Sequence, residues 1–317
     1  MTTYKETNGT NIEILSEDPA NPVQGQIWYN TDSSTLKGLG YIGTAAWSTG
    51  GNLNTARAAT GGAGTLTAGL AFAGGYPAKA DTESYNGSSW TELNNLNTAR
   101  ASLAGTGTQT AALAFGGYPA LSLTETWNGT NWTEVNNLNT GRDNIGSATA
   151  GTNTAALAFG GLPLTANTES WNGTNWTEVN NLNTATRGTA GAGTVASALS
   201  SGGANPGITA NSELWNGTNW TEVNNLNTAR RNLAGAGINN TSAIAYGGYS
   251  TAYVGVTEEW NGSNWTEVAD LSTGRSESSS IGSSAAALAG GGYGGTYLAT
   301  TEEWTGVGPA VQTFSDA

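Results

Sequence analysis

The chain has 317 residues and a formal net charge of −13, and it contains no Cys and no His. This inventory excludes disulfide frameworks, the usual zinc sites, Ser-His-Asp triads and Cys-His pairs, and no ligand spacing points to calcium, so we expect no metal and no other cofactor. The acidic balance argues against nucleic acid or membrane as a partner, and no run of 18 apolar residues is present.

Residues 1–40 form the first expected domain and precede the regular part of the chain. Residues 1–7 contain no apolar stretch, so we do not expect a secretory signal. Segments 27–30 and 35–37 are rich in β-forming residues and are separated by a short polar stretch. We interpret them as a small hairpin.

From residue 41 onwards the chain repeats itself, and three markers each occur six times. A Trp begins the segment Trp-Thr-Glu-Val/Leu at steps of 42 to 45 residues, with a divergent first copy: Trp47, Trp90, Trp132, Trp176, Trp220 and Trp265. A pair of Gly residues follows each small apolar run, beginning at Gly74, Gly116, Gly160, Gly202, Gly247 and Gly291. A Glu-x-aromatic motif ends at Tyr85, Trp127, Trp171, Trp215, Trp260 and Trp304.

One repeat contains four short strands, which we call a, b, c and d. In the second complete repeat they are expected at residues 101–107, 110–115, 123–127 and 132–135, with an Asn128-Gly129 hairpin between c and d. Four antiparallel strands in a unit of 40 to 50 residues are typical of a β-propeller blade. The Gly and Ala residues of strand a fit an innermost strand, where bulky side chains would hold the blades apart.

The two ends of the repeated region complement each other. The last repeat supplies strands a to c up to Trp304 and then continues without a Trp-Thr-Glu-Val segment, whereas residues 41–53 resemble an isolated strand d around Trp47. Pairing the two would complete one blade and hide the sheet edges. We therefore predict an all-β fold, a six-bladed propeller spanning residues 41–317 and closed between an N-terminal strand d and C-terminal strands a to c.

Two family resemblances follow from these motifs. The Gly-Gly pairs, the aromatic pair Trp127 and Trp132, and the segment 138–142 (Leu-Asn-Thr-Gly-Arg) resemble kelch repeats over residues 41–304, although kelch repeats usually have a slightly longer aromatic spacing and often a Pro before the Arg. Residues 18–31 are similar to N-terminal segments of tailed-phage virion proteins, a group in which the Asn-Gly-Thr-Asn-Trp hairpin also appears. The resemblances imply kelch-like blades and a virion location.

The b–c loops differ most between repeats and carry exposed aromatic residues, which is typical of a recognition surface on a rigid scaffold. The candidate ligand-binding residues in these loops are Tyr76, Tyr118, Tyr249, Tyr253, Tyr293 and Tyr297. The alternative is ordinary sequence drift, with the Tyr side chains packed on a neighbouring blade.

The d–a loops are expected on the same face, and each carries one Arg: Arg57, Arg100, Arg142, Arg187, Arg230 and Arg275. The fourth, Arg187, is expected to follow one extra residue. A ring of guanidinium groups can hold a carboxylate, a sulfate or an acidic sugar. Alternatively, each Arg pairs with a Glu of strand c, at Glu83, Glu125, Glu169, Glu213, Glu258 and Glu302. The presence of one copy in every blade favours the second interpretation.

The same regularity argues against an enzyme, because the Glu positions repeat from blade to blade and no unmatched cluster of acids stands out. The first hypothesis is a non-enzymatic virion structural or tail-fibre-type protein within a homo-oligomeric assembly. Residues 1–40 would attach to other virion proteins, and the propeller would bind a host-surface carbohydrate or a neighbouring virion protein. The alternatives are a cellular kelch scaffold for protein partners and, more remotely, a carbohydrate-active enzyme.

Overall fold

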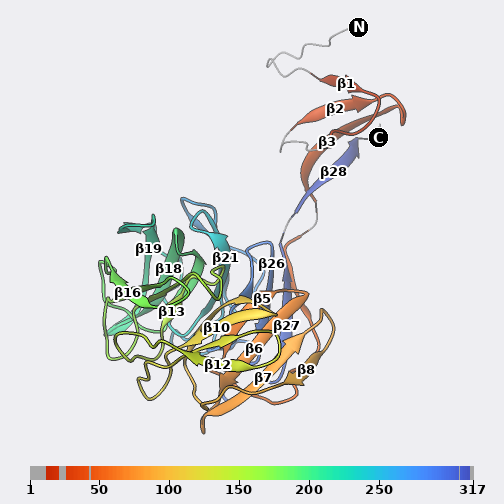
Figure 1. Ribbon diagram of the computed structural model, residues 1–317. Helices are drawn as coiled ribbons and strands as arrows, with labels where there is room; N and C mark the ends of the chain where they lie inside the picture. Colours follow the sequence, from red (N-terminus) through yellow and green to blue (C-terminus); the bar gives the residue numbers. More distant parts are fainter. Residues whose placement is uncertain (1–11, 21–25, 43, 307, 315–317) are drawn as a thin grey trace. The chain divides into compact units, whose positions relative to one another are not determined.

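The computed structural model describes residues 12–20, 26–42, 44–306 and 308–314 and divides the chain into two compact units. The larger unit is Ala46–Thr305, and the smaller combines Met1–Ala45 with Gly306–Ala317 (Figure 1). The described residues form strands, turns and loops without a helix, in agreement with the predicted all-β class. It follows that none of them belongs to an apolar helix of membrane-spanning length.

The smaller unit contains one four-stranded sheet in the order β1 (Glu13–Leu15), β2 (Ile27–Asn30), β3 (Thr35–Ile42) and β28 (Gly308–Phe314). Strands β2 and β3 form the predicted hairpin, with Asn30 paired to Thr35. Strand β1 is parallel to β2, and β28 is antiparallel to β3.

The expected domain boundary after residue 40 is therefore corrected. Strand β3 extends to Ile42 and pairs with β28, so residues 306–317 belong to the smaller unit and not to the propeller-like unit. The physical reason is that the backbone of β28 completes the edge of β3, a non-local pairing that no local sequence motif announces.

One side of the small sheet is held by Asp18. Its Oδ1 accepts hydrogen bonds from the Trp28 indole N–H (3.0 Å) and from the Asn30 amide (2.7 Å), and its Oδ2 lies 2.9 Å from the Lys37 ammonium. Trp28 is completely buried. These donors lower the pKa of the Asp18 carboxyl group to about 2, with the Lys37 hydrogen bond as the largest cause.

The larger unit contains, within the described residues, six antiparallel four-stranded sheets, each with its strands in the order a, b, c, d. The first is β5 (Gly61–Thr65), β6 (Ala68–Gly74), β7 (Lys79–Tyr85) and β8 (Trp90–Leu93). The second is β9 (Ala104–Thr108), β10 (Ala111–Phe115), β11 (Thr124–Trp127) and β12 (Trp132–Val135). The third is β13 (Gly146–Ser147), β14 (Ala156–Phe159), β15 (Thr168–Trp171) and β16 (Trp176–Val179).

The fourth sheet is β17 (Ala190–Thr194), β18 (Ser197–Asn205), β19 (Gly207–Trp215) and β20 (Trp220–Val223). The fifth is β21 (Ala234–Asn239), β22 (Ser242–Tyr246), β23 (Thr257–Trp260) and β24 (Trp265–Glu267). The sixth is β25 (Ile281–Gly282), β26 (Ala286–Gly290), β27 (Thr301–Thr305) and β4 (Ala46–Thr49). The predicted pairing of the Trp304 strand with the Trp47 strand is confirmed, with Trp304 opposite Trp47. Together the sheets form a propeller-like arrangement (Figure 1).

The c–d hairpins have the predicted turn chemistry. In the second sheet, Asn128 Oδ1 accepts the backbone N–H groups of Thr130 and Asn131, and Gly129 has a φ of 91° that suits Gly. The turn aligns Trp127 opposite Trp132, so their rings lie 5.4 Å apart. The c–d hairpins and the a–b turns define one face of the unit, which we call the hairpin face. The b–c and d–a loops define the other, which we call the b–c face.

The Trp of each strand d joins its sheet to the preceding one. Its indole N–H donates, at 3.0–3.1 Å, to a hydroxyl at the start of strand c in the neighbour. The six pairs are Trp47–Thr257, Trp90–Thr301, Trp132–Thr82, Trp176–Thr124, Trp220–Thr168 and Trp265–Ser212. These bonds satisfy buried indole donors and make neighbouring sheets interdependent.

The innermost strands approach one another too closely for most side chains. A Cβ atom on Gly62 would lie 2.7 Å from the carbonyl oxygen of Ser280, and one on Gly191 would lie 1.9 Å from that of Ser147. The expectation that small residues in strand a let the sheets meet at the centre is confirmed by these distances.

A ring of six backbone hydrogen bonds surrounds the centre on the b–c face. The residue two positions after each d–a Arg position has a φ between 50° and 60°, and its N–H donates to the corresponding carbonyl of the preceding sheet at 2.7–2.9 Å. The six members are Ala59, Ser102, Asn144, Gly188, Asn232 and Glu277, and the Ala59 N–H donates to Glu277. Left-handed backbone is strained for most of these residue types, and the ring compensates for that strain.

The d–a Arg side chains are structural. Five have fully buried side chains and lie 2.6–2.9 Å from a Glu of strand c: Arg57–Glu83, Arg100–Glu125, Arg142–Glu169, Arg230–Glu258 and Arg275–Glu302. The other oxygen of each Glu accepts the backbone N–H of the incoming d–a loop, from Asn97 to Glu125 in the second sheet for example. Burial lowers the pKa of these Arg groups, and the facing carboxylates oppose that effect.

The fourth sheet departs from this rule. Gly161 N–H donates to the carbonyl of Thr186, as Gly117 N–H donates to that of Arg142, so Thr186 occupies the position of the Arg. The prediction that one extra residue precedes the repeated Arg in this sheet is therefore wrong. The repeat has its usual length, Thr186 replaces the Arg, and Arg187 occupies the next position. Glu213 accepts the N–H groups of Asn183 and Thr184 without a facing guanidinium, and burial raises its pKa.

We expect Arg100→Thr to lower the free energy of unfolding by about 3–5 kcal/mol, because Glu125 would remain buried without its cation. Denaturant unfolding measures the change. The matched control is Arg187→Ala, which removes a partly exposed guanidinium that has no carboxylate partner within 4.0 Å among the described residues and should change stability by less than about 0.5 kcal/mol. Similar losses in both variants would contradict the structural role of the pair.

The Asp18 carboxyl group should titrate near pH 2 in the folded small sheet. Because its folded pKa lies below its ordinary value, its contribution to stability is present above about pH 4 and is lost as the pH falls towards 2. Carboxyl carbon NMR measures the midpoint, and the Trp28 indole proton should shift with it. Asp18→Asn should abolish that shift, and a midpoint near 4 would show that the hydrogen bonds do not act as described.

Candidate ligand-binding pocket

The b–c loops of the fifth and sixth sheets have the same local construction. Each contains Tyr-x-x-x-Tyr, and the two Tyr residues of a loop pair across it through isolated β-bridges, Tyr249 with Tyr253 and Tyr293 with Tyr297. Backbone bonds from Ser250 to Ala252 and from Gly294 to Thr296 tighten the loop tips. Each loop therefore fixes two aromatic rings next to each other.

The rings form one continuous chain of edge-to-face contacts. The centroid distances are 5.2 Å for Tyr249–Tyr253, 5.3 Å for Tyr253–Tyr293 and 5.5 Å for Tyr293–Tyr297, with interplanar angles of 65–75°. This is the preferred geometry of aromatic pairs, so the rings hold one another in place. The chain connects the fifth sheet to the sixth.

The first sheet extends the chain through Tyr76. The Tyr297 hydroxyl accepts the Tyr76 backbone N–H (3.0 Å) and donates to its carbonyl (2.9 Å). The Tyr76 hydroxyl bonds to Ser102 at 2.7 Å, and its ring lies 5.7 Å from that of Tyr118. The structure thus brings all six predicted Tyr residues together along one part of the b–c face.

Five of these Tyr residues line a cavity of about 480 Å³ together with polar groups. Tyr118 is half exposed beside Tyr76 and does not line it. The lining residues are Tyr76, Arg231, Asn232, Tyr249, Tyr253, Ser276, Glu277, Tyr293 and Tyr297. The volume lies in the range of small-molecule sites, and an aromatic wall with a few convergent polar groups is typical of them.

Three polar side chains give the pocket its charge pattern. The Arg231 guanidinium lies over the Tyr249 ring, 5.4 Å from its centroid, because Arg231 and Tyr249 are paired through their backbones. The Asn232 amide donates to Glu277 Oε1 at 2.8 Å. Burial raises the pKa of Glu277, whereas the Asn232 hydrogen bond and the charge of Arg231 lower it.

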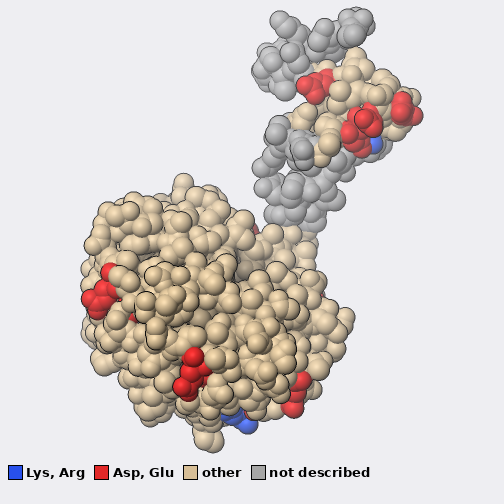
Figure 2. Space-filling view, in the orientation of Figure 1, with Lys and Arg blue, Asp and Glu red and all other residues tan. Residues whose placement is uncertain are grey.

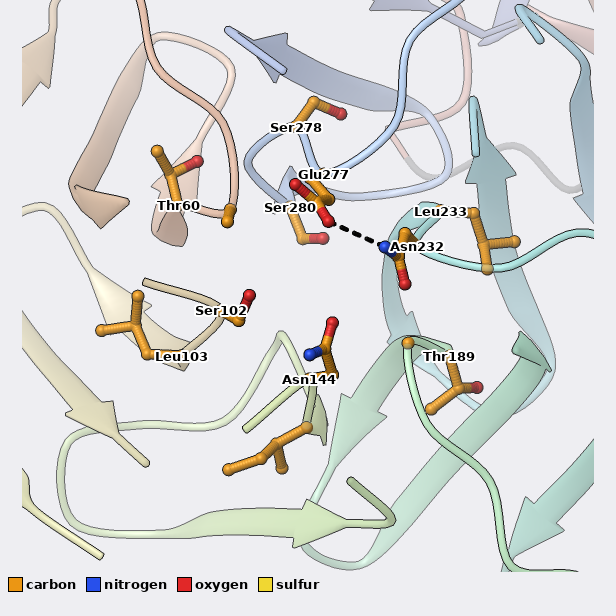
Figure 3. A pocket seen from close by; sticks show the side chains of 13 residues that line it. Thr60, Ser102, Leu103, Asn144, Thr189, Asn232, Leu233, Glu277, Ser278 and Ser280 are labelled. Atoms are coloured by element: carbon orange, nitrogen blue, oxygen red, sulfur yellow. Dashed lines mark hydrogen bonds between the residues drawn. The ribbon is translucent and has the colours of Figure 1, made fainter. Parts of the chain in front are cut away.

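Asn232 and Glu277 also line a second, smaller cavity of about 90 Å³ at the centre of the hydrogen-bonded ring. Figure 3 shows this cavity, with the Asn232–Glu277 hydrogen bond at one side and side chains such as Ser102, Asn144 and Thr189 around it. The pair therefore stands between the Tyr-lined pocket and the centre of the ring. Its backbone is fixed by the ring, which positions the Glu277 carboxylate.

A larger cavity of about 570 Å³ opens on the hairpin face, lined mainly by Gly, Thr and Ala of the a–b turns. Its lining contains no charged residue and no aromatic residue. Charged side chains are also sparse on the side of the larger unit visible in Figure 2. The charges of Arg231 and Glu277 within one pocket are therefore distinctive.

The described residues contain no group of three or more Asp or Glu side chains placed to hold a metal ion. Within the Tyr-lined pocket, Glu277 is the one carboxylate, and Arg231 is the one cation, among the lining residues. The geometry is suited to binding through ring faces and hydrogen bonds.

The predicted Arg residues do not contribute to this pocket. Arg57, Arg100, Arg142, Arg230 and Arg275 are fully buried against their Glu partners, which corrects the hypothesis that a ring of Arg side chains holds an anion. Arg187 is partly exposed but does not line the pocket. A guanidinium whose donors already face a buried carboxylate cannot reach a ligand.

Arg231, Asn232 and Glu277 were missed by the sequence interpretation. Arg231 follows an Arg of the repeat, and Glu277 is the one acid among the six ring residues. The available signal was the break in the repeat: the position of Glu277 holds Ala, Ser, Asn, Gly and Asn in the other sheets. That signal becomes readable only when the repeats are aligned on the d–a Arg.

Comparisons with known proteins give the fold alone. No family model and no curated protein matches the chain. Among the solved structures that match is that of YjhT, with a TM-score of 0.66, 15% sequence identity, and coverage of 83% of this chain and 99% of that chain. At this identity the chain is similar to YjhT in its propeller-like all-β architecture.

Proposed function

We propose that this protein is a non-enzymatic virion structural protein of the tail-fibre type whose larger unit binds a host-surface glycan in the Tyr-lined pocket. The observation that carries the glycan assignment is the pocket itself, which combines five Tyr side chains with Arg231, Asn232 and Glu277. Sugar rings present apolar C–H faces and many hydroxyl groups, so aromatic walls with a few hydrogen-bonding groups match them.

The proposed fold is a closed six-bladed propeller with kelch-like blades. Two cyclic sets of interactions support closure: the six Trp–hydroxyl bonds between consecutive sheets, and the six backbone bonds of the ring. Both sets include a link between the first and the sixth sheet, Trp90 to Thr301 and Ala59 to Glu277. A closed ring leaves only short, protected inner edges and gives a rigid base for the loops.

The absence of catalytic function is proposed from the carboxylates. Hydrolysis of a glycosidic bond usually requires two carboxyl groups on either side of that bond. Glu277 is the one carboxylate among the described residues that line the pocket, and the strand-c Glu residues are buried against Arg or loop N–H groups. The pocket therefore suits binding better than acid–base chemistry.

The attachment role rests on the smaller unit and on the resemblance of residues 18–31 to virion proteins. A row of apolar side chains crosses all four strands on one face of the small sheet: Ile14 opposite Tyr29, Tyr29 opposite Leu36, and Leu36 opposite Phe314. Ile14, Tyr29 and Phe314 are exposed. Another virion protein, or another copy in a homo-oligomer, would cover such a row.

The chain enters and leaves the larger unit on the same face. Ala46 and Thr305 lie opposite each other where β4 begins and β27 ends, which is on the hairpin face. The chain therefore leaves the larger unit on the face opposite to the Tyr-lined pocket.

Glycan binding should be lost when the centre of the Tyr chain is removed. On a glycan array, we expect Tyr253→Ala to weaken binding about 30-fold or more, because its ring contacts both Tyr249 and Tyr293. Leu164→Ala is the control, since Leu164 is exposed in the b–c loop of the third sheet and does not line the pocket. Unchanged binding by the Tyr253 variant would move the ligand to another surface.

The virion assignment has a separate test. Mass spectrometry of purified particles should detect this chain at a stoichiometry expected for a structural component, and electron microscopy should locate it on the particle. Its absence from purified particles would overturn the virion assignment, and capture of an intracellular protein partner by the b–c face would favour a cellular kelch scaffold.

A further inference from the structure

The charges of Arg231 and Glu277 share one pocket without neutralising each other in an ion pair. No carboxylate lies within 4.0 Å of the Arg231 guanidinium among the described residues, and its buried Nε has no hydrogen-bond partner there. Glu277 receives the Asn232 amide on Oε1, and no hydrogen bond to its Oε2 is present among the described residues. The pocket thus offers a free cationic donor and a free anionic acceptor to the same ligand.

We propose that the pocket selects electrically neutral sugars, in which neighbouring hydroxyl groups satisfy Glu277 and Arg231 at the same time. This inference rests on the proposed glycan-binding function and specifies its ligand class. A hydroxyl group is both donor and acceptor, so one polyol can donate to Glu277 Oε2 and accept from Arg231. Among sugars, a neutral polyol is the class that can satisfy both groups without bringing a like charge of its own into the cavity.

Charged ligands meet a like charge in this pocket. A carboxylated or sulfated sugar would be attracted by Arg231 but repelled by Glu277, and an amino sugar would be attracted by Glu277 but repelled by Arg231. Like-charge contacts in a partly desolvated site are a common means of excluding unwanted partners. Because Arg231 is held over Tyr249 and Glu277 is held by Asn232, neither charge can easily turn away.

The Tyr chain supplies the remaining contacts. Its rings are fixed by edge-to-face packing, and Tyr297 is fixed further by its two bonds to the Tyr76 backbone. Rigid aromatic rings provide contact area at a low cost in conformational entropy. In this arrangement the rings bind the sugar body without regard to charge, and Glu277 and Arg231 determine which sugars are accepted.

The test is the ratio of binding between charge classes on one glycan array that carries neutral, carboxylated, sulfated and amino glycans. The wild-type protein should bind neutral glycans in preference to the other three classes. Glu277→Gln should weaken neutral binding about tenfold through loss of a charged hydrogen bond and should raise carboxylated and sulfated binding relative to neutral. Arg231→Gln should raise amino-glycan binding relative to neutral.

Leu164→Ala is the matched control and should leave every ratio unchanged. A ratio between classes does not depend on the fraction of protein that is folded, so a merely structural effect of either substitution would not move it. The inference fails if charged glycans bind the wild-type protein as well as neutral ones, or if Glu277→Gln leaves the ratios unchanged while Tyr253→Ala abolishes binding. Either of these outcomes leaves the proposed glycan-binding function intact. Binding of no glycan at all overturns both.

Discussion

The close approach of six inner strands around one centre is the constraint on which the larger unit depends. The strands meet where a Cβ atom on Gly62 or Gly191 would collide with a neighbouring backbone, and the ring of backbone hydrogen bonds forms because the strands are this close. The ring requires left-handed backbone at one residue in each sheet. That requirement fixes where Asn232 and Glu277 stand, and therefore where the Tyr-lined pocket meets the centre.

Buried ion pairs hold the sheets to their connecting loops. Each Glu of strand c receives a loop N–H and, in five sheets, an Arg, so one carboxylate joins the loop, the strand and the guanidinium. A buried pair of this kind adds little net stability over well-packed apolar residues, but removing one partner is costly because the other charge stays buried. In the fourth sheet, Thr186 occupies the Arg position, and Glu213 accepts the N–H groups of two loop residues instead of facing a guanidinium.

Repeated positions and variable positions of the six sheets have different roles in the larger unit. Residues that recur in every sheet, such as the strand-d Trp and its hydroxyl partner, hold the unit together. Residues at positions that differ from sheet to sheet, such as Glu277 and Arg231, lie beside the Tyr-x-x-x-Tyr loops. Loops on the propeller-like unit place these groups without needing a separate domain.

The sequence by itself determined the all-β class, the four-stranded repeat, the Asn-Gly hairpins and the pairing of the Trp47 and Trp304 segments, because each depends on local turn chemistry or on a strictly repeated motif. It also singled out six Tyr residues as candidates, since these stand in loops that differ from repeat to repeat, and five of them line the pocket. Only the tertiary structure decided that the d–a Arg side chains are buried, because pairing with Glu depends on which strand faces the loop. It alone brought Arg231 and Glu277 into the Tyr-lined pocket and joined β28 to β3, since these contacts link segments far apart in the chain.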